Sequence, residues 1–360
     1  MIFRQPLQAD ENKDREWRHF VAVFLSVLLG GIASIYLFVL LVDPYSVIPF
    51  SLPIDHRIVS ISQRHMYPQI VRSQHFDSLI VGTSTSRLLD PELLGKKFGV
   101  RLANLAMDAA TAWEQNAMLD YFRRKAGPPK LVIIALDGVW CDQNADRTRV
   151  TFRGFPYWLY DDEPWNDYFN LFNSGTVEIA GRLVGYQLGL YPERVRYDGY
   201  DAFVPPEPTY DLAHARQKIW GSRIPETPPD ALPLPLLPNE RSALSFPALT
   251  WLDASLAKLP QSTLKILAFM PVHIAAQPWP GSRNEAIEAE CKARITDIAR
   301  KRGAKAIDWR FNSVLTRNDA NYWDSLHYRV PIASRIAEEL AQAVLQGTAS
   351  ADGTYRILEP

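Results

Sequence analysis

The hydrophobic pattern of this chain is most uneven near its start. Residues 20–42 read FVAVFLSVLLGGIASIYLFVLLV, a run without a charged side chain. About 20 helical residues cross the hydrocarbon core of a bilayer, whereas a soluble helix needs only an apolar stripe. A cleavable signal peptide is the alternative, but its apolar region is usually about 7–15 residues and ends in small residues. Because this run ends at Val42-Asp43-Pro44, we expect an uncleaved transmembrane helix over residues 20–42.

The charges on the two sides of this run predict its orientation. Residues 1–19 carry lysine and arginine side chains, whereas residues 43–54 carry neither. Basic residues are enriched on the cytoplasmic side of membrane helices. We therefore expect residues 1–19 to form a cytoplasmic tail and the large remainder of the chain to lie outside the cytoplasm.

Beyond the anchor, short apolar runs alternate with longer helical patterns. The expected strands cover residues 78–82, 102–107, 131–136, 263–269 and 305–308, and the main expected helices cover residues 59–73, 112–125, 284–302 and 331–345. Strands that alternate with helices are typical of a parallel sheet covered on both faces. The pattern predicts an α/β fold, a three-layer sandwich with a parallel sheet, preceded by one transmembrane helix.

One long segment interrupts this alternation. Residues 141–260 contain an aromatic-rich part and a proline-rich part, and they follow the third expected strand. Open α/β sheets place their sites at the carboxyl ends of their strands, so this insertion starts at the edge where a site is expected. The expected organisation is therefore a connector over residues 43–74, an α/β domain over residues 75–347 with the insertion, and a loosely ordered tail over residues 348–360.

Composition excludes several classes of function. The 39 basic and 40 acidic side chains give a net charge of −1, which argues against a nucleic-acid partner. The two cysteines, Cys141 and Cys291, are too few for a disulfide scaffold or a cysteine-rich zinc site, and whether they pair stays open. His56, His65 and His75 lack metal-ligand spacing, and the sequence has no glycine-rich phosphate loop. We expect no metal and no cofactor.

Two short motifs carry candidate chemistry. Residues 82–87 read GTSTSR directly after the first expected strand, where a serine on a tight turn lies near backbone N–H groups that can face an oxyanion. The alternative is a helix N-cap at Ser84 or Thr85. Residues 324–327 read DSLH before the last helix, and an aspartate can orient a nearby histidine. A helix cap and a surface histidine are the alternative for this second motif.

In this order the two motifs resemble the SGNH (GDSL-like) hydrolase superfamily. The resemblance covers about residues 75–345 outside the insertion, because residues 104–110, NLAMDAA, are similar to the second block of membrane-anchored members. Residues 136–140, LDGVW, fall where the third block follows its strand. The chain looks closest to the bacterial cell-envelope branch, which includes alginate O-acetyltransferase-like proteins and the D-alanyl-lipoteichoic acid biosynthesis protein.

The resemblance implies roles for individual residues. Ser84 matches the nucleophile, His327 the general base and Asp324 the acid that orients it, with Ser86 a weaker candidate nucleophile. Asn104 is a possible oxyanion donor beside the backbone N–H of Ser84.

The chain departs from the family pattern at three places. Thr83 stands where the usual motif has aspartate, and Asp108 or Ala109 stands where the second block has its glycine. The third block lacks its usual motif and has Asp137 in that neighbourhood.

The resemblance also implies a function. A serine enzyme of this branch would move an acyl group to a sugar hydroxyl of an envelope or extracellular polysaccharide, or to water. Its partners would be the lipid bilayer, a carbohydrate substrate and an integral-membrane acyl-donor protein. It would be a single-pass protein of the bacterial inner membrane with its large domain on the periplasmic side. The alternative is a catalytically degenerate scaffold that serves as a binding or assembly module.

Three further features have two interpretations each. Arg87 could hold an anionic substrate group or form a salt bridge, and His273, after the fourth expected strand, could contact substrate or cap a turn. The aromatic side chains within residues 155–165 suit sugar rings, or they pack within the insertion.

Overall fold

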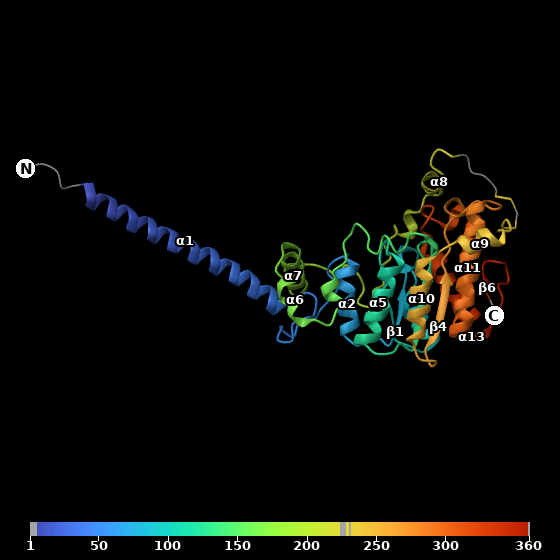
Figure 1. Cartoon of the computed structure of the whole chain (residues 1–360), viewed down its shortest axis with the longest axis horizontal. Helices are drawn as coiled ribbons and strands as arrows, with labels where there is room; N and C mark the ends of the chain where they lie inside the picture. Colours follow the sequence, from blue (N-terminus) through green and yellow to red (C-terminus); the bar gives the residue numbers. More distant parts are fainter. Residues whose placement is uncertain (1–5, 224–227, 230–231, 359–360) are drawn as a thin grey trace, which may run out of the picture. The chain divides into compact units, whose positions relative to one another are not determined.

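The computed structural model describes residues 6–223, 228–229 and 232–358, and it divides into two compact units (Figure 1). Residues 60–161 and 193–360 form the α/β unit. Residues 1–59 and 162–192 form the anchor unit.

The α/β unit is built on a six-stranded sheet with the order β2-β1-β3-β4-β5-β6. The parallel strands are β1 (Ser78–Val81), β2 (Leu102–Asn104), β3 (Leu131–Leu136), β4 (Leu264–Phe269) and β5 (Lys305–Asp308). A short strand, β6 (Arg356–Ile357), pairs antiparallel with β5. This strand differs from the expected loosely ordered tail, because the buried Tyr355 ring packs beside Trp309 and holds the end of the chain to the sheet.

Helices cover both faces of the sheet, which confirms the predicted three-layer α/β sandwich. On one face α5 (Ala112–Lys125) packs on β1, α11 (Arg283–Arg302) packs on β5, and α10 (Pro247–Ala257) lies between the two helices. The short helix α2 (Gln63–Arg72) packs against α5. On the other face α13 (Val330–Gln346) packs on β5 and on α4 (Pro91–Phe98), which lies against β2. The remaining elements of this unit are α3 (Ser84–Arg87), α8 (Leu212–Trp220), α9 (Pro238–Ala243), α12 (Val314–Arg317) and the short 3₁₀ turns at Gly138–Cys141, Tyr157–Leu159, Glu207–Thr209, Ile274–Ala276 and Asp319–Asn321.

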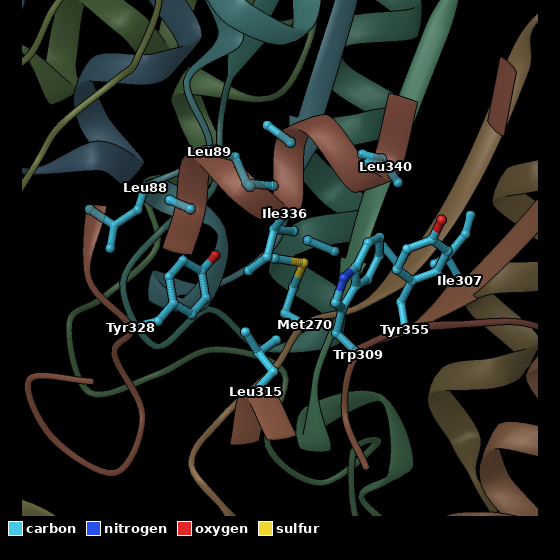
Figure 2. Close-up of a cluster of buried hydrophobic side chains, with 14 of the residues drawn as sticks. Leu88, Leu89, Met270, Ile307, Trp309, Leu315, Tyr328, Ile336, Leu340 and Tyr355 are labelled. Carbon is cyan, nitrogen blue, oxygen red and sulfur yellow. The ribbon is translucent and has the colours of Figure 1, made fainter. Parts of the chain in front are cut away.

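The core under α4 and α13 reaches the edge where the site is expected. Alternate strand side chains, among them Ile80, Ile133 and Ile307, enter one buried cluster with the apolar face of α13. Figure 2 shows that Leu88 and Tyr328 belong to the same cluster. Because Leu88 follows α3 and Tyr328 precedes α13, burial of this cluster fixes two distant segments of the chain against each other.

Capping residues mark the ends of the main helices. The first turn of α5 has a capping box, in which the Thr111 hydroxyl accepts from the Glu114 N–H and the Glu114 carboxylate accepts from the Thr111 N–H. The helix α11 begins after the cap Ser282 and ends at Gly303, whose φ of 63° suits glycine.

The anchor unit contains α1 (Pro6–Val42), α6 (Pro164–Asn170) and α7 (Ser174–Gln187). Within the part of the chain that the structure describes, α1 has the one segment that is long and apolar enough to cross a membrane. Its last turns are covered, since Val39 and Val42 are buried and the Tyr36 hydroxyl donates to the Tyr168 carbonyl at 2.7 Å. The segment expected as one insertion is thus divided, because residues 162–192 pack with α1.

Candidate active site

The turn after β1 leaves one serine accessible. A Cβ at Gly82 would lie 2.3 Å from the Ser86 Oγ and 2.8 Å from the Ala135 Cβ, so only glycine lets this turn pack on β3. Ser86 is fully buried and its hydroxyl donates to the Thr83 carbonyl at 3.0 Å. Ser84, the first residue of α3, is partly exposed, so its hydroxyl is the one that a substrate can reach.

A histidine and an aspartate from the loop before α13 complete a triad. The His327 Nε2 lies 2.9 Å from the Ser84 Oγ, and the His327 Nδ1 lies 2.9 Å from one Asp324 carboxylate oxygen and 3.1 Å from the other. A carboxylate only accepts hydrogen bonds, so Nδ1 carries the proton and Nε2 is left to accept from the serine hydroxyl. The structure therefore joins the three predicted residues in the hydrogen-bonding order that a serine nucleophile requires.

Asp324 is held in its ionised form. Partial burial acts to raise the pKa of this carboxyl, but hydrogen bonds from His327 and from the Leu326 and His327 backbone N–H groups hold the pKa below its usual range. The Asp324 carboxylate thus stays charged where it can orient His327 and stabilise the imidazolium that forms during catalysis.

Three contacts hold the loop that carries Asp324 and His327. Tyr322 and Tyr328 form an antiparallel bridge, and the Trp323 N–H donates to the His327 carbonyl at 2.8 Å. The buried Tyr328 hydroxyl donates to the Thr85 carbonyl, which ties the loop directly to α3. Because this bond joins neighbours of the nucleophile and of the base, it supports the Ser84–His327 distance.

Arg87 forms a buried ion network. Its guanidinium is only 3% exposed and pairs with Asp108 and with Asp201, while burial raises the pKa of Asp201 even though Arg87 acts to lower it. Of the two interpretations of Arg87, the structure shows the salt bridge rather than a group open to substrate. The Arg87 guanidinium also lies 4.6 Å from the centre of the Phe203 ring.

The insertion contributes residues that sequence reasoning missed. The Phe203 ring packs edge-on against the His327 ring, with centroids 5.2 Å apart. Asp201 and Phe203 therefore connect Arg87 with His327, and they come from a segment without a regular pattern of apolar residues. Neither residue had a sequence signal, because an isolated Asp-x-Phe in an irregular segment is common.

Asn104 holds α3 rather than facing substrate. Its side-chain amide donates to the Ser86 and Leu89 carbonyls at 2.9 Å each, and its side-chain oxygen accepts from the Ala106 N–H at 3.1 Å. This fully buried geometry does not support the expected oxyanion role of Asn104. The Asn104 amide instead binds carbonyls at the end of α3, a helix of four residues, because the last carbonyls of a helix have no partner within it.

The Asp137 carboxylate supports the turn that carries Ser84. Its carboxylate accepts from the Thr83 hydroxyl and, at 3.1 Å, from the Val139 N–H. Burial raises the pKa of Asp137, although the Thr83 hydrogen bond acts in the opposite direction. Thr83, which replaces the aspartate of the family motif, thus has a structural partner, and Asp137 acts on the turn rather than directly on Ser84.

Of the two interpretations of His273, the structure shows the cap of a turn rather than a side chain open to substrate. The side chain is 0% exposed, its Nδ1 accepts from the Ala275 N–H at 3.1 Å, and its Nε2 lies 3.1 Å from Asp319. Burial lowers the pKa of His273, so the ring is neutral. Its backbone N–H donates to the Ser325 carbonyl at 3.0 Å, which supports the loop of the triad.

A second turn lies beside the nucleophile turn. The Met107 N–H donates to the Gly82 carbonyl at 3.1 Å, and Ala109 has a left-handed backbone with φ of 50°. This conformation is uncommon for a residue with a Cβ. Ala109, one of the two residues that could stand where the resembled family has glycine, therefore adopts the kind of backbone that glycine favours.

Comparisons with known proteins find only distant similarity. No family model and no curated protein matches this chain. Among solved structures, the chain is similar to a protein from Bacteroides fragilis described as a "putative acylhydrolase", with 12% identity over 75% of this chain and 86% of that chain. The TM-score of 0.33 is too low to support a functional argument, so the functional conclusions rest on the site itself.

Replacement of Asp324 by asparagine is expected to lower kcat for ester cleavage by about 10²–10⁴-fold, because the amide no longer fixes the His327 tautomer. The acid limb of the pH–rate profile should move to lower pH, since the imidazolium loses the carboxylate that stabilises it. The Asp324 carboxylate of the parent is charged, because hydrogen bonds hold its pKa below the usual range. Steady-state kinetics over a pH series measures both effects, and an unchanged kcat and profile would contradict the assigned role.

Proposed function

We propose that this chain is a membrane-anchored serine esterase or O-acyltransferase of the SGNH type. The observation that carries the proposal is the triad, with the Ser84 Oγ 2.9 Å from the His327 Nε2 and the His327 Nδ1 2.9 Å from Asp324. The position agrees with this chemistry, because Ser84 follows β1 where the chain order reverses between β2 and β3. Sites of open α/β sheets lie at such switch points.

The triad supports a two-step acyl transfer. The Ser84 Oγ attacks the acyl carbonyl while the His327 Nε2 takes its proton, and the leaving alcohol then receives that proton as the acyl ester forms on Ser84. In the second step His327 deprotonates water or a sugar hydroxyl, which attacks the ester and releases Ser84. We assign the oxyanion contacts to the backbone N–H groups of Ser84 and Ala109, because the bond between Met107 and Gly82 joins their two turns.

Two features support a position outside the cytoplasm. Cys141 and Cys291 form a disulfide, and disulfides persist in oxidising compartments such as the periplasm. Basic residues precede the apolar run at residues 20–42, as expected for a cytoplasmic N-terminus. We therefore place the α/β unit on the periplasmic side of a bacterial inner membrane.

A cleft in the α/β unit supports a carbohydrate acceptor. It has a volume of about 510 Å³, lies along α5 and α10, and is lined by Trp113, Tyr157 and Trp251 together with the charged Asp120 and Lys258. Flat rings beside charged groups suit sugars, which offer apolar faces and hydroxyl edges. In this proposal the acceptor is an envelope polysaccharide, and an integral-membrane partner supplies the acyl donor.

The test uses the full chain in nanodiscs with p-nitrophenyl acetate, in the presence and absence of a neutral oligosaccharide. A transferase releases p-nitrophenol faster with the acceptor and forms an acetylated oligosaccharide that mass spectrometry detects. Trp251→Ala should remove this acceptor-dependent part, whereas Trp279→Ala, a partly exposed tryptophan outside the cleft, should retain it. Turnover without transfer identifies a hydrolase, and a folded protein without turnover supports the non-catalytic scaffold.

A further inference from the structure

The helix α6 of the anchor unit has its apolar stripe on the outside. Trp165, Tyr168 and Phe169 of α6, and Phe172 two residues after its end, follow the i, i+3, i+4, i+7 spacing of one helix face. In a soluble protein such a face points to the core, but here Trp165 is 76% exposed and Phe169 is 82% exposed. The buried side of α6 holds Asp167 instead. A face of this kind indicates a nonaqueous surrounding.

Contacts within the anchor unit place α6 beside the end of the membrane helix. The Phe172 ring packs edge-on against the Tyr36 ring of α1 with centroids 5.4 Å apart, and the Tyr36 hydroxyl donates to the Tyr168 carbonyl at 2.7 Å. Phe50, in the segment after α1, stacks near Tyr168 with centroids 6.4 Å apart and is itself exposed. The exposed aromatic rings therefore lie next to α1, the helix that is expected to cross the bilayer.

The depth of these contacts follows from helix geometry. Tyr36 lies six residues before Val42, where α1 ends, which corresponds to about 9 Å along a helix. The apolar run over residues 20–42 is about 34 Å long in helical form, slightly more than the roughly 30 Å hydrocarbon core. With the run centred on the hydrocarbon core, Tyr36 and the residues in contact with it lie about 7 Å inside the edge of the core, within the roughly 5–10 Å to which interfacial helices bury an apolar face.

We propose that α6 is an interfacial helix that inserts Trp165 and Phe169 into the lipid bilayer beside α1, together with Phe172 from the turn after it, as a second attachment in addition to the membrane span. The inference requires that α1 crosses the bilayer, but it is independent of the chemistry at Ser84. No lysine or arginine occurs from residue 154 to residue 181, whereas acidic residues precede α6 at 161–163. The attachment therefore uses apolar burial rather than attraction to anionic headgroups.

The test places an environment-sensitive fluorophore on single added cysteines in the full chain, since the native cysteines are joined in a disulfide and do not label. Phe169→Cys and Trp165→Cys report on the stripe, Glu178→Cys on the exposed side of α7 is the matched control, and Leu29→Cys reports on the span. Each protein is reconstituted into phosphatidylcholine nanodiscs, where iodide and nitroxide-labelled lipids quench the probe from water and from lipid.

We expect the probes at 165 and 169 to be quenched by the labelled lipid and to be severalfold less accessible to iodide than the probe at 178. Addition of phosphatidylglycerol should leave both readings unchanged. Iodide access at 165 and 169 equal to that at 178, with the probe at 29 shielded, would overturn the proposal while the span stands. Protection in native membranes but not in phosphatidylcholine nanodiscs would also overturn it, because a protein partner rather than lipid would then cover the stripe.

Discussion

Ser84→Ala is expected to abolish ester cleavage, with a fall in kcat of about 10⁴-fold or more, because no other hydroxyl of the turn can replace the nucleophile. The Ser84 Oγ lies 2.9 Å from the His327 Nε2, and the His327 Nδ1 is paired with a charged carboxylate. Hydrolysis of p-nitrophenyl acetate by the full chain measures the effect, and circular dichroism checks that the variant is folded.

Ser86→Ala is the matched control, since it removes a hydroxyl two residues further along the same helix. The Ser86 hydroxyl is buried and donates to the Thr83 carbonyl, so its loss should weaken the turn without removing the nucleophile. A fluorophosphonate probe should label the parent and Ser86→Ala but not Ser84→Ala. Labelling of Ser84→Ala at the rate of the parent would refute the triad and leave the scaffold interpretation.

The sequence indicates the three triad residues because each lies in a motif beside an element with a strong local signal. The run at 131–136 is apolar at every position and becomes β3 with the same bounds, and α5 has the bounds expected over 112–125. Once the strands are placed, the residues that follow β1 and precede α13 must share the carboxyl edge of the sheet. Ser84 and His327 are therefore predictable together, although 243 residues separate them.

Side chains near this edge are harder to predict, because their direction depends on the path of each loop. Asn104 ends β2 and His273 follows β4, and both side chains turn inward. The Asn104 amide donates to carbonyls of α3, and the His273 ring accepts from the Ala275 N–H. Phe203 comes from a segment without a hydrophobic period, and only its contact with His327 reveals its place. A period of polar and apolar residues reports which face of an element is buried, but it does not report where an irregular segment returns to the sheet.

The apolar stripe on α6 shows a second limit of prediction from sequence. The spacing from Trp165 to Phe172 is that of an amphipathic helix, and such a stripe is equally compatible with a protein core, a sugar and a lipid surface. The packing against Tyr36 distinguishes these surroundings, because it joins the helix to α1 and not to the sheet. The assignment of a surface therefore needs contacts between segments that are far apart in the sequence.

Loss of the disulfide is expected to lower the free energy of unfolding of the α/β unit by about 3–5 kcal/mol, because the bond closes a very long loop in the unfolded chain. Cys141 ends the turn after β3 and Cys291 lies on α11, with 150 residues between them. The closed loop contains most of the insertion and β4.

The measurement compares urea unfolding of the parent with that of the double variant Cys141→Ser, Cys291→Ser, each with and without dithiothreitol. Reduction should lower the midpoint of the parent to that of the double variant and should leave the double variant unchanged. Ester cleavage at low temperature should be largely retained in the double variant, since neither cysteine belongs to the hydrogen-bonded triad. Equal midpoints for the oxidised parent and the double variant would show that the bond contributes nothing to stability, and the chain-entropy argument would then fail for this fold.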